Sequence, residues 1–244
     1  MENYISNKNI WITGASSGIG FEIVRELAQF HTNLILSARN FDKITQKIAS
    51  LFTEKNNANF FAFPLDLRDE ENIEDSFVSI YSEVGYPDVL INNAGVFKAN
   101  SFLKTSYEEF KSMVDTNLCG AFVATKCVLP KMIENKNGLI INISSVTAEK
   151  AFPYCAAYSA SKSGLLAMMR SLREEVRQYG IKVVNISPGA TATELWGNKL
   201  DENREKMSMP NDIAKLVMYV LEMSRLSPQS MIEEITIRPQ LGDL

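Results

Sequence analysis

Short apolar runs alternate with longer amphipathic stretches along most of the chain. The apolar runs predict strands at Asn9–Thr13, Asn33–Ala38, Asn59–Pro64, Asp88–Asn92, Leu139–Ser144, Lys182–Ile186 and Glu233–Ile237. The periodicity between them predicts helices at Ile19–Gln29, Ile73–Glu83, Tyr107–Glu134, Ala157–Gln178 and Asp212–Met223. Strands that alternate with helices predict an α/β fold, a doubly wound, seven-stranded parallel sheet with helices on both faces.

The composition gives no sign of a boundary between two domains. The chain has 244 residues, of which 45% are hydrophobic and 22% charged, close to a globular average. It contains no internal repeat, low-complexity run or Pro/Gly/Ser-rich linker. Because α/β folds often reach about 250 residues as one unit, we expect one domain over residues 1–244.

The charge balance narrows the classes of partner. A net charge of −4 and a pI near 5.3 do not suit general binding to nucleic acid, which needs a basic face. No apolar run approaches the length of a membrane span, and the first residues lack a secretory signal. Cys119, Cys127 and Cys155 form no CxxC pair, which argues against a disulfide framework or a metal site. We therefore expect a cytoplasmic protein without a metal, acting on a small molecule.

A glycine-rich loop follows the first predicted strand. Thr13-Gly14-Ala15-Ser16-Ser17-Gly18-Ile19-Gly20 has the spacing G-x-x-x-G-x-G and leads into a helix. Gly14 suits a tight turn, Gly18 a close approach of backbone to a pyrophosphate, and Gly20 close packing of helix on strand. The free N–H groups at the helix start favour an anion. We interpret the loop as a dinucleotide site rather than a plain βα turn.

The same residues also satisfy the hydrolase pattern G-x-S-x-G, over Gly14–Gly18. That interpretation needs a histidine late in the chain, after an acidic residue. The single histidine, His31, comes just after the first predicted helix, where we expect an ordinary loop residue. The order of a hydrolase triad is therefore missing.

The end of the second predicted strand bears on the choice of cofactor. A carboxylate about 20 residues beyond the glycines usually binds the adenosine ribose of NAD. Arg39 stands there instead, and its guanidinium favours a 2′-phosphate, with Ser37 as a second donor. The alternative is a solvated arginine beside a capping Asn40, with Asp42 in the first turn of the next helix. We favour NADP(H), with NAD(H) as the alternative.

Further motifs follow the later strands. Asp66-Leu67, Asn92-Asn93-Ala94-Gly95, Tyr158-Ser159-Ala160-Ser161-Lys162 and Pro188-Gly189 occur in order, and together with the glycine loop they resemble the short-chain dehydrogenase/reductase family over nearly the whole chain. The resemblance implies one NAD(P)-binding Rossmann-type domain. The cofactor-contacting residues that it implies, taken with Ser37 and Arg39, are Gly14, Ser16, Ser17, Gly18, Ile19, Gly20, Ser37, Arg39, Asp66, Leu67, Asn93, Ala94, Gly95, Tyr158, Lys162, Pro188, Gly189, Thr191 and Thr193.

Tyr158 and Lys162 are the central catalytic candidates. Reduction of a ketone by hydride leaves an alkoxide that needs a proton, and a phenol can supply it. Lys162 lies four residues after Tyr158, so a helix places both on one face. We expect the ammonium to lower the phenol pKa from about 10. The resemblance implies that Lys162 also binds the nicotinamide ribose. Alternatively, the two residues form an ordinary exposed pair.

Ser145 and Asn117 complete the family's four active-site positions. Ser145, after the fifth predicted strand, can orient the substrate oxygen, whereas we expect its neighbour Ser144 to face the other way. Asn is unfavourable inside a helix, and Asn117 falls within Tyr107–Glu134. The resemblance implies a local kink there, with a water held between the Asn117 backbone and Lys162. Strand-end and surface roles are the alternatives for Ser145 and Asn117.

The sequence departs from the family in three places. Ser17 stands where many NADP-using members carry Arg or Lys. The segment Ser227–Pro239 lacks a double glycine found in many tetrameric members, which argues against a 3-ketoacyl-carrier-protein reductase. We nevertheless expect a homodimer or homotetramer. Residues 194–209, where the family places its substrate lid, are short and highly charged, which suggests a small or partly open pocket. Candidate pocket walls are Phe97, Phe152, Tyr154 and Trp196.

The sequence therefore predicts an NADP(H)-dependent oxidoreductase that acts on a carbonyl or alcohol substrate. The alternatives are a regulatory protein that senses NADP without turnover, and the ketoacyl-carrier-protein reductase. A dehydratase or epimerase would need a C-terminal substrate domain, for which little chain follows Thr193. The substrate, the direction and the stereochemistry are not encoded in any motif that we identify.

Overall fold

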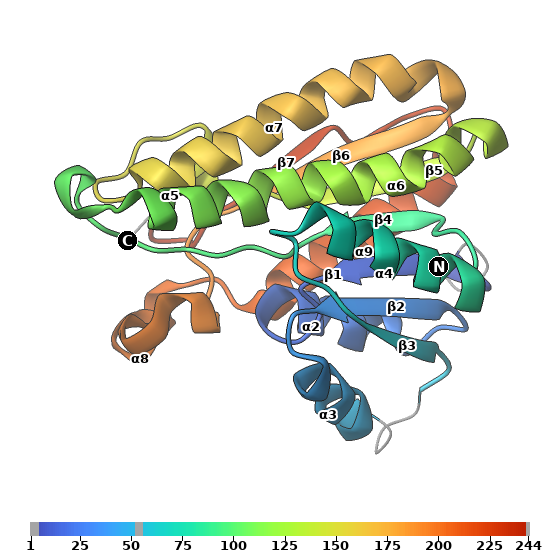
Figure 1. Cartoon of the computed structure of the whole chain (residues 1–244), viewed down its shortest axis with the longest axis horizontal. Helices are drawn as coiled ribbons and strands as arrows, with labels where there is room; N and C mark the ends of the chain where they lie inside the picture. The colour runs from blue at the N-terminus through green and yellow to red at the C-terminus, as the bar shows by residue number, and fades with distance from the viewer. Residues whose placement is uncertain (1–4, 52–55, 243–244) are drawn as a thin grey trace.

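Seven parallel strands form one sheet in the order β3-β2-β1-β4-β5-β6-β7 (Figure 1). The computed structural model describes residues 5–51 and 56–242. The strands are β1 (Asn9–Thr13), β2 (Asn33–Ala38), β3 (Asn59–Pro64), β4 (Val89–Asn92), β5 (Gly138–Ile143), β6 (Ile181–Pro188) and β7 (Glu234–Ile237). The first three strands have the predicted bounds, and the others differ by one or two residues at their ends. The predicted doubly wound sheet is confirmed.

Helices cover both faces of this sheet. They are α2 (Gly18–Leu27), α3 (Phe41–Leu51), α4 (Glu70–Glu83), α5 (Tyr107–Val114), α6 (Gly120–Asn135), α7 (Ala156–Val176), α8 (Leu200–Asn203) and α9 (Pro210–Leu226). Buried side chains of α2, α3 and α9 join one hydrophobic cluster, and those of α4, α6 and α7 join the cluster on the opposite face. The sheet is therefore shielded from water on both sides, as parallel sheets require.

Alternation along β1 shows how the sequence places these two clusters. Ile10 and Ile12 belong to the cluster under α2 and α9, whereas Trp11 between them belongs to the cluster under α6 and α7. All three side chains are fully buried. Successive strand residues point to opposite faces, so an uninterrupted apolar run supplies both cores at once.

Three buried asparagines hold the central strands in register near their carboxyl ends. Asn92, Asn142 and Asn185 are neighbours across β4, β5 and β6. The amide of Asn92 donates to Asn142 at 2.9 Å, and that of Asn142 donates to Asn185 at 3.1 Å. Such a buried polar ladder penalises any slip of one strand against the next, because a slip leaves amides unpaired.

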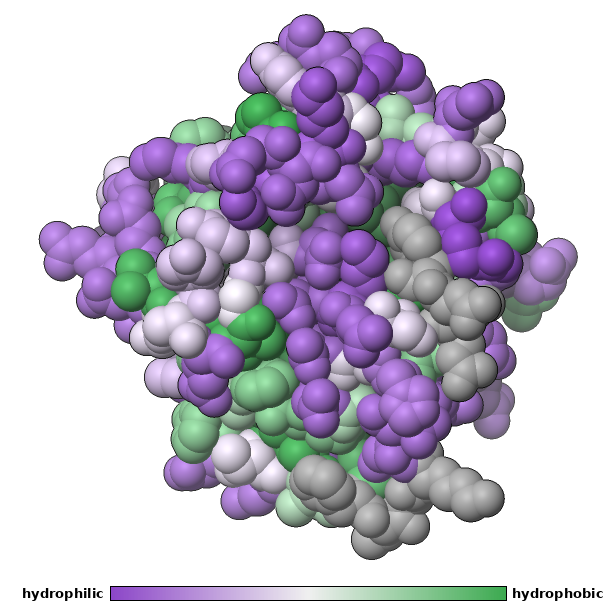
Figure 2. Space-filling view, turned by 90° about the vertical axis from the view of Figure 1, so that its right-hand side faces the viewer, coloured by the Kyte–Doolittle hydropathy of each residue, from purple (hydrophilic) through white to green (hydrophobic). Residues whose placement is uncertain are grey.

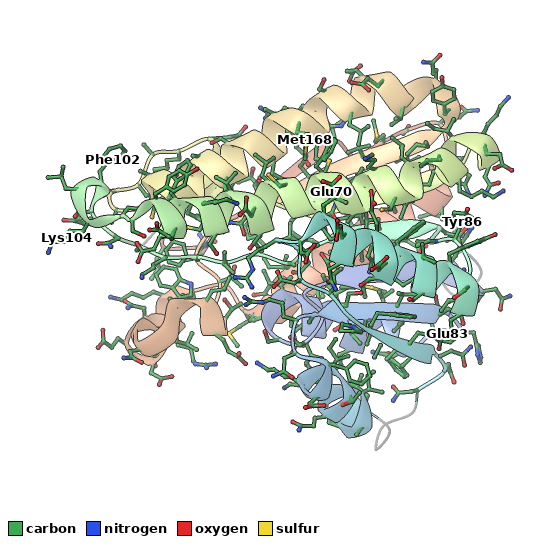
Figure 3. All side chains as sticks on the ribbon, viewed as in Figure 1. Glu70, Glu83, Tyr86, Phe102, Lys104 and Met168 are labelled. Carbon is green, nitrogen blue, oxygen red and sulfur yellow. The ribbon has the colours of Figure 1, made fainter. Side chains whose placement is uncertain are left out.

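The labelled side chains of Figure 3 identify the two ends of the sheet. Figure 3 shows Phe102 and Lys104 at the end where the strands stop, and Glu83 and Tyr86 at the end where they begin. The latter end, which faces the viewer in Figure 2, is mainly hydrophilic, with small separate apolar areas. Across residues 5–51 and 56–242, none of the helices combines the length and apolar character that a membrane span demands.

Candidate active site

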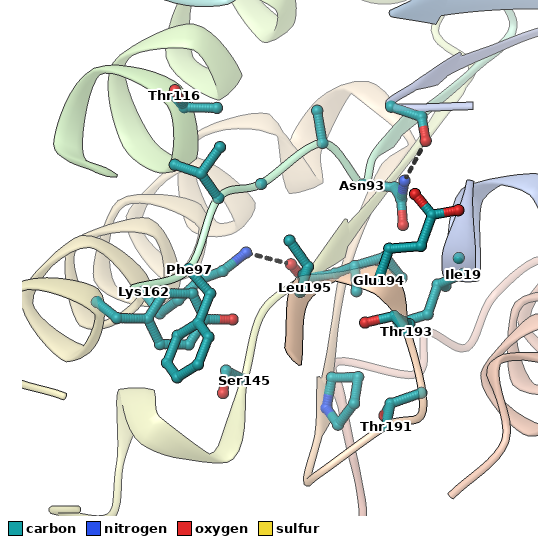
Figure 4. A pocket seen from close by; sticks show the side chains of 18 of the residues that line it. Ile19, Asn93, Phe97, Thr116, Ser145, Lys162, Thr191, Thr193, Glu194 and Leu195 are labelled. Carbon is teal, nitrogen blue, oxygen red and sulfur yellow. Dashed lines mark hydrogen bonds between the residues drawn. The ribbon is translucent and has the colours of Figure 1, made fainter. Parts of the chain in front are cut away.

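A pocket of about 830 Å³ crosses the carboxyl ends of six strands. Its lining includes a residue one or two positions after the end of each of them: Gly14, Arg39, Asp66, Asn93, Ser145 and Gly189. Strand order reverses between β1 and β4, and ligands of doubly wound sheets bind at this point. Figure 4 shows Phe97, Ser145 and Lys162 on one side of the pocket, and Ile19, Thr193 and Glu194 on the other.

The glycine loop has the geometry that its spacing predicts. Gly14 and Gly18 have φ of +69° and +54°, a region that side chains disfavour. A Cβ on Gly14 would also lie 2.7 Å from the Ala94 Cα. Gly20 sits behind the loop, where a Cβ would lie 2.4 Å from the Asn93 Nδ2. Gly20 is therefore absent from the pocket lining and acts by close packing, as predicted.

The start of α2 is suited to binding an anion. Its N-cap residue, Ser17, makes no side-chain capping bond, and the first turn contains no acidic residue. Ser16, Ser17, Gly18 and Ile19 line the pocket there. The uncapped N–H groups and the helix dipole therefore favour a phosphate at this point.

Thr13 and Asn93 join the glycine loop to the end of β4. The Thr13 hydroxyl accepts hydrogen bonds from the backbone N–H groups of Asn93 and Ala94, at 3.1 and 3.2 Å. The Asn93 amide donates to the carbonyls of Thr13 and Gly14, at 2.9 and 3.2 Å. Asn93, Ala94 and Gly95 all line the pocket. This network holds two pocket walls at a set separation.

Arg39 lies on the pocket wall, exposed at the end of β2. In the part of the chain that the structure describes, its guanidinium has no hydrogen-bond or salt-bridge partner. Ser37 differs from the expectation: its side chain is fully buried, and its hydroxyl accepts a hydrogen bond from the Trp11 indole at 2.9 Å. Strand alternation turns that hydroxyl into the core, so Ser37 contributes its backbone, whose carbonyl accepts from Gly14 at 2.7 Å.

Asp66 and Leu67 line the pocket after β3. Arg68 binds the Asp66 carboxylate through Nε at 2.9 Å, and this hydrogen bond holds the pKa of Asp66 below its usual value. The first residue of α6, Gly120, packs directly against Leu67. A Cβ on Gly120 would lie only 2.5 Å from the Leu67 carbonyl oxygen. As predicted, Asp42 belongs to the first turn of α3, and Asn40 accepts from the Lys43 N–H at 2.8 Å.

The segment after β6 forms another wall of the pocket. Pro188, Gly189, Thr191 and Thr193 line it, and the Gly189 N–H donates to Ile237 of β7 at 2.7 Å. Residues 194–209 form the short helices η5 (Glu194–Lys199), α8 and η6 (Arg204–Lys206). We call this segment the lid. Its Glu194 reaches Lys43 of α3 in a 2.7 Å ion pair across the pocket mouth.

Tyr158, Lys162 and Ser145 meet in one corner of the pocket. Tyr158 and Lys162 come from the first half of α7, as their spacing predicts. The Lys162 Nζ lies 5.9 Å from the centre of the Tyr158 ring and donates to the Ile143 carbonyl at 2.8 Å (Figure 4). The phenol hydrogen-bonds to the side chain of Ser145, not to that of Ser144, although both serines line the pocket.

The acidity of Tyr158 differs from the expectation. Burial raises the pKa of the phenol to about 12, while the hydrogen bond to Ser145 lowers it in part. Burial also lowers the pKa of Lys162 to about 8. The expected lowering of the Tyr158 pKa by Lys162 is not found. Desolvation is the largest influence on both groups, because removal from water penalises the charged form of each. At neutral pH the phenol carries its proton.

Asn117 occupies a break in the long helical pattern of residues 107–134. A π-helical turn, η2 (Asp115–Cys119), separates α5 from α6, at the place where the resemblance implies a kink, and such turns are a common cause of kinks. The Asn117 side chain is 1% exposed and does not line the pocket. It accepts from the Val96 N–H at 2.8 Å, and donates to the Val96 carbonyl and the Ser161 hydroxyl, both at 3.0 Å. Its side chain therefore positions the strand-end loop against α7.

Asn117 and Lys162 also approach Gly95 from behind the pocket wall. A Cβ on Gly95 would lie 3.3 Å from the Asn117 Oδ1 and 3.6 Å from the Lys162 Nζ. Because residue 95 has no side chain, Asn117 and Lys162 can come close to the backbone of the pocket wall.

The four candidate pocket walls, Phe97, Phe152, Tyr154 and Trp196, all line the pocket. The ring of Phe97 meets Tyr158 edge-on at 4.9 Å between centres and lies 5.9 Å from Trp196 of the lid. Tyr154 adopts φ of +64°, a strained conformation for tyrosine. Its carbonyl accepts from the Asn100 N–H at 2.9 Å, so the segment before α7 is tied to the loop after β4.

The hydrolase interpretation fails on geometry. Ser16 lies at the carboxyl end of β1, whereas His31 is exposed in the turn between α2 and β2, at the other end of the sheet. A triad would need both at one edge. The prediction of His31 as a loop residue is confirmed.

Sequence reasoning missed several contacts that shape the site. The carbonyl of Ile143, the backbone of Val96 and the Lys43–Glu194 ion pair have no signal in the local sequence pattern. The contacts of the Thr13 hydroxyl could have been predicted, because a hydroxyl at a strand end beside a glycine loop can bind the backbone of the neighbouring strand.

Comparison with known proteins connects this geometry to a family. The sequence model of the short chain dehydrogenase family matches residues 8–204. The chain is 34% identical over 208 residues to dehydrogenase/reductase SDR family member 7 of Mus musculus, with 84% of this chain and 61% of the mouse protein covered. It thus spans less than two thirds of that relative. An uncharacterized oxidoreductase of Staphylococcus saprophyticus is 32% identical, with 99% of this chain and 100% of that protein covered.

A solved structure is similar over the whole fold. An alcohol dehydrogenase from the archaeon Thermococcus sibiricus, complexed with 5-hydroxy-NADP, superposes with a TM-score of 0.88 at 28% identity, covering 98% of this chain and 99% of that one. With its matched motifs, its seven-stranded sheet and its pocket at the carboxyl edge, the chain belongs to the short-chain dehydrogenase/reductase family of oxidoreductases.

Proposed function

We propose that this protein is an NADP(H)-dependent oxidoreductase that transfers a hydride between nicotinamide and a carbonyl or alcohol substrate. One observation carries the proposal: a phenol, an amine and a serine hydroxyl converge in the same pocket that the glycine loop lines. The volume of this pocket, about 830 Å³, lies in the upper part of the usual range for ligand sites, about 300–1,000 Å³. It has room for a dinucleotide with a substrate beside it.

The pocket residues fit a dinucleotide in three places. The uncapped start of α2 suits the pyrophosphate, and the Lys162 ammonium suits the ribose hydroxyls nearest the reacting end. Arg39 suits the adenosine end, where its guanidinium favours a 2′-phosphate over a plain hydroxyl. The similar Thermococcus sibiricus structure was solved with an NADP derivative, in keeping with this assignment. When bound, nicotinamide supplies or accepts the hydride.

In the direction of reduction, Tyr158 donates the proton. The carbonyl carbon gains a hydride and its oxygen gains the phenolic proton, so that an alcohol forms and a phenolate remains. Ser145, already hydrogen-bonded to Tyr158, orients the substrate oxygen and stabilises its developing charge. A neutral phenol suits this role, and the positive charge of Lys162 stabilises the phenolate that it leaves. Asn117 acts through position, by holding Val96 against α7.

Replacement of Tyr158 tests the proposal directly. Tyr158→Phe removes the acidic proton but keeps the ring that packs on Phe97. We expect kcat to fall by about 10²–10⁴-fold, the usual contribution of a general acid. Binding of NADPH should remain, as measured by fluorescence titration. Turnover of the variant at the wild-type rate would refute the role of Tyr158.

Self-association and location form the rest of the proposal. We propose a homodimer or homotetramer in the cytoplasm, with no nucleic-acid or membrane partner. The edge strand β7, which survives without the double glycine, and the exposed aromatic rings of Phe110 and Phe122 on α5 and α6 support association. Because the segment Ser227–Pro239 departs from the pattern of many tetrameric members, the proposal includes both a dimer and a tetramer.

A further inference from the structure

The pocket divides by charge into two unlike ends. Five lining residues are charged, namely Arg39, Lys43, Asp66, Lys162 and Glu194. Arg39, Lys43 and Asp66 follow β2 and β3, and Glu194 is paired with Lys43. All charged lining residues except Lys162 thus lie at the adenosine end that the proposed function assigns to the cofactor.

Beyond Tyr158 the lining is mainly apolar and aromatic, with Thr147 and Cys155 as its polar members. We define the aromatic end as Phe97, Phe152, Tyr154 and Trp196, with the aliphatic side chains of Val96, Val146 and Leu195 beside them. Among the described residues that line this end, none carries a charge. A cation outside the lining, Lys150, lies over the face of the Phe152 ring at 5.3 Å.

Ring geometry at this end suits a planar guest. Phe97 meets Tyr158 edge-on and Trp196 at a tilt, with centres 4.9 and 5.9 Å apart. Both distances lie in the range in which aromatic pairs attract, about 4.5–7 Å. Trp196 and Phe97 are only partly buried, so part of each ring surface is left for a ligand. A planar apolar group beside the Tyr158 hydroxyl would cover this surface and remove it from water.

A charged ligand would find no charged partner in the lining of this end. A carboxylate or phosphate placed among these rings would lose part of its hydration without gaining a salt bridge to a lining residue. We infer that the substrate is an uncharged carbonyl compound that carries an aromatic ring close to the carbonyl, rather than a keto acid or a phosphorylated sugar. The inference rests on the proposed function for the identity of the reacting group.

Three methyl ketones test the inference. Acetophenone carries the ring alone, 4-acetylbenzoate adds a carboxylate to it, and cyclohexyl methyl ketone replaces it by a saturated ring. We measure kcat/KM with NADPH, and binding of each ketone to the protein–NADP⁺ complex by ligand-observed NMR. We expect acetophenone to exceed 4-acetylbenzoate by about tenfold or more in both measurements, because the carboxylate is desolvated without a partner. Cyclohexyl methyl ketone should fall between them.

Variants of Trp196 show whether the aromatic end is responsible. Trp196→Lys places a cation in the lid, and we expect it to reduce the preference for acetophenone over 4-acetylbenzoate by about tenfold, since a paired charge is tolerated. Trp196→Leu should reduce the preference for acetophenone over the saturated ketone. Tyr219→Leu, an exposed aromatic residue of α9 outside the pocket, is the matched control and should change neither ratio.

The two measurements separate the failure of the inference from the failure of the proposed function. Equal or tighter binding of 4-acetylbenzoate to the wild-type complex would overturn the aromatic, uncharged substrate class, whatever the turnover. An unchanged ratio in Trp196→Lys would also overturn it. Tight, selective binding of acetophenone with no oxidation of NADPH by any ketone would uphold the ligand class and refute the reductase activity.

Discussion

Replacement of Lys162 by methionine should change how the stability of the protein depends on pH. Lys162 is 3% exposed, and burial lowers its pKa from 10.5 to about 8. The folded protein therefore releases the lysine proton at lower pH than the unfolded chain does. A lysine of this kind destabilises the fold while it is charged, and the penalty is relieved as pH rises from 8 towards 10.5.

The magnitude follows from the pKa shift. Each unit is equivalent to about 1.36 kcal/mol, so the full penalty is about 3 kcal/mol. Between about pH 7 and pH 10, integration of the two titrations gives about 2.5 kcal/mol of relief. Methionine fills a similar volume without a charge. It also loses the hydrogen bond to the Ile143 carbonyl, which costs about 1 kcal/mol.

Urea unfolding of the wild type and Lys162→Met at several pH values between 7 and 10 measures this effect. The free energy of unfolding of the wild type should rise relative to that of the variant by about 2.5 kcal/mol across the range. Tyr158, whose pKa is raised to about 12, keeps its proton in the folded state of both proteins below pH 10. The control is Lys215→Met, an exposed position of α9, which should run parallel to the wild type. A constant difference between wild type and Lys162→Met, or an opposite trend, would refute the reasoning.

Two further substitutions test the cofactor end and the helix break. Arg39→Ala should weaken NADPH binding by about tenfold to a hundredfold, because a charge-assisted hydrogen bond contributes about 1.5–3 kcal/mol, while NADH binding changes little. Calorimetric titration with both cofactors measures this, and equal losses for the two would count against a 2′-phosphate contact. Asn117→Ala removes three buried hydrogen bonds and should lower the free energy of unfolding by about 2–4 kcal/mol. A loss below 1 kcal/mol in urea would mean that Val96 finds other partners.

The sequence alone determined the strand order along the chain, the doubly wound class and the main catalytic candidates. These features depend on local rules. Alternating and helical periodicity identify each strand and helix, positive φ explains Gly14 and Gly18, and a spacing of four places Tyr158 and Lys162 on one face of a helix. Parallel strands then bring their carboxyl ends to one edge, so residues far apart in the chain could be assigned to one pocket.

Only the tertiary structure decided the direction of the Ser37 hydroxyl, the partner of the Asn117 side chain and the ion pair between Lys43 and Glu194. Each depends on strand register and helix packing over long separations in sequence, which no local pattern contains. The acidity of Tyr158 belongs to the same class. A spacing of four residues brings an amine near a phenol, but the amount of water excluded from both is set by every element packed around them, and here that desolvation is the largest influence on both pKa values.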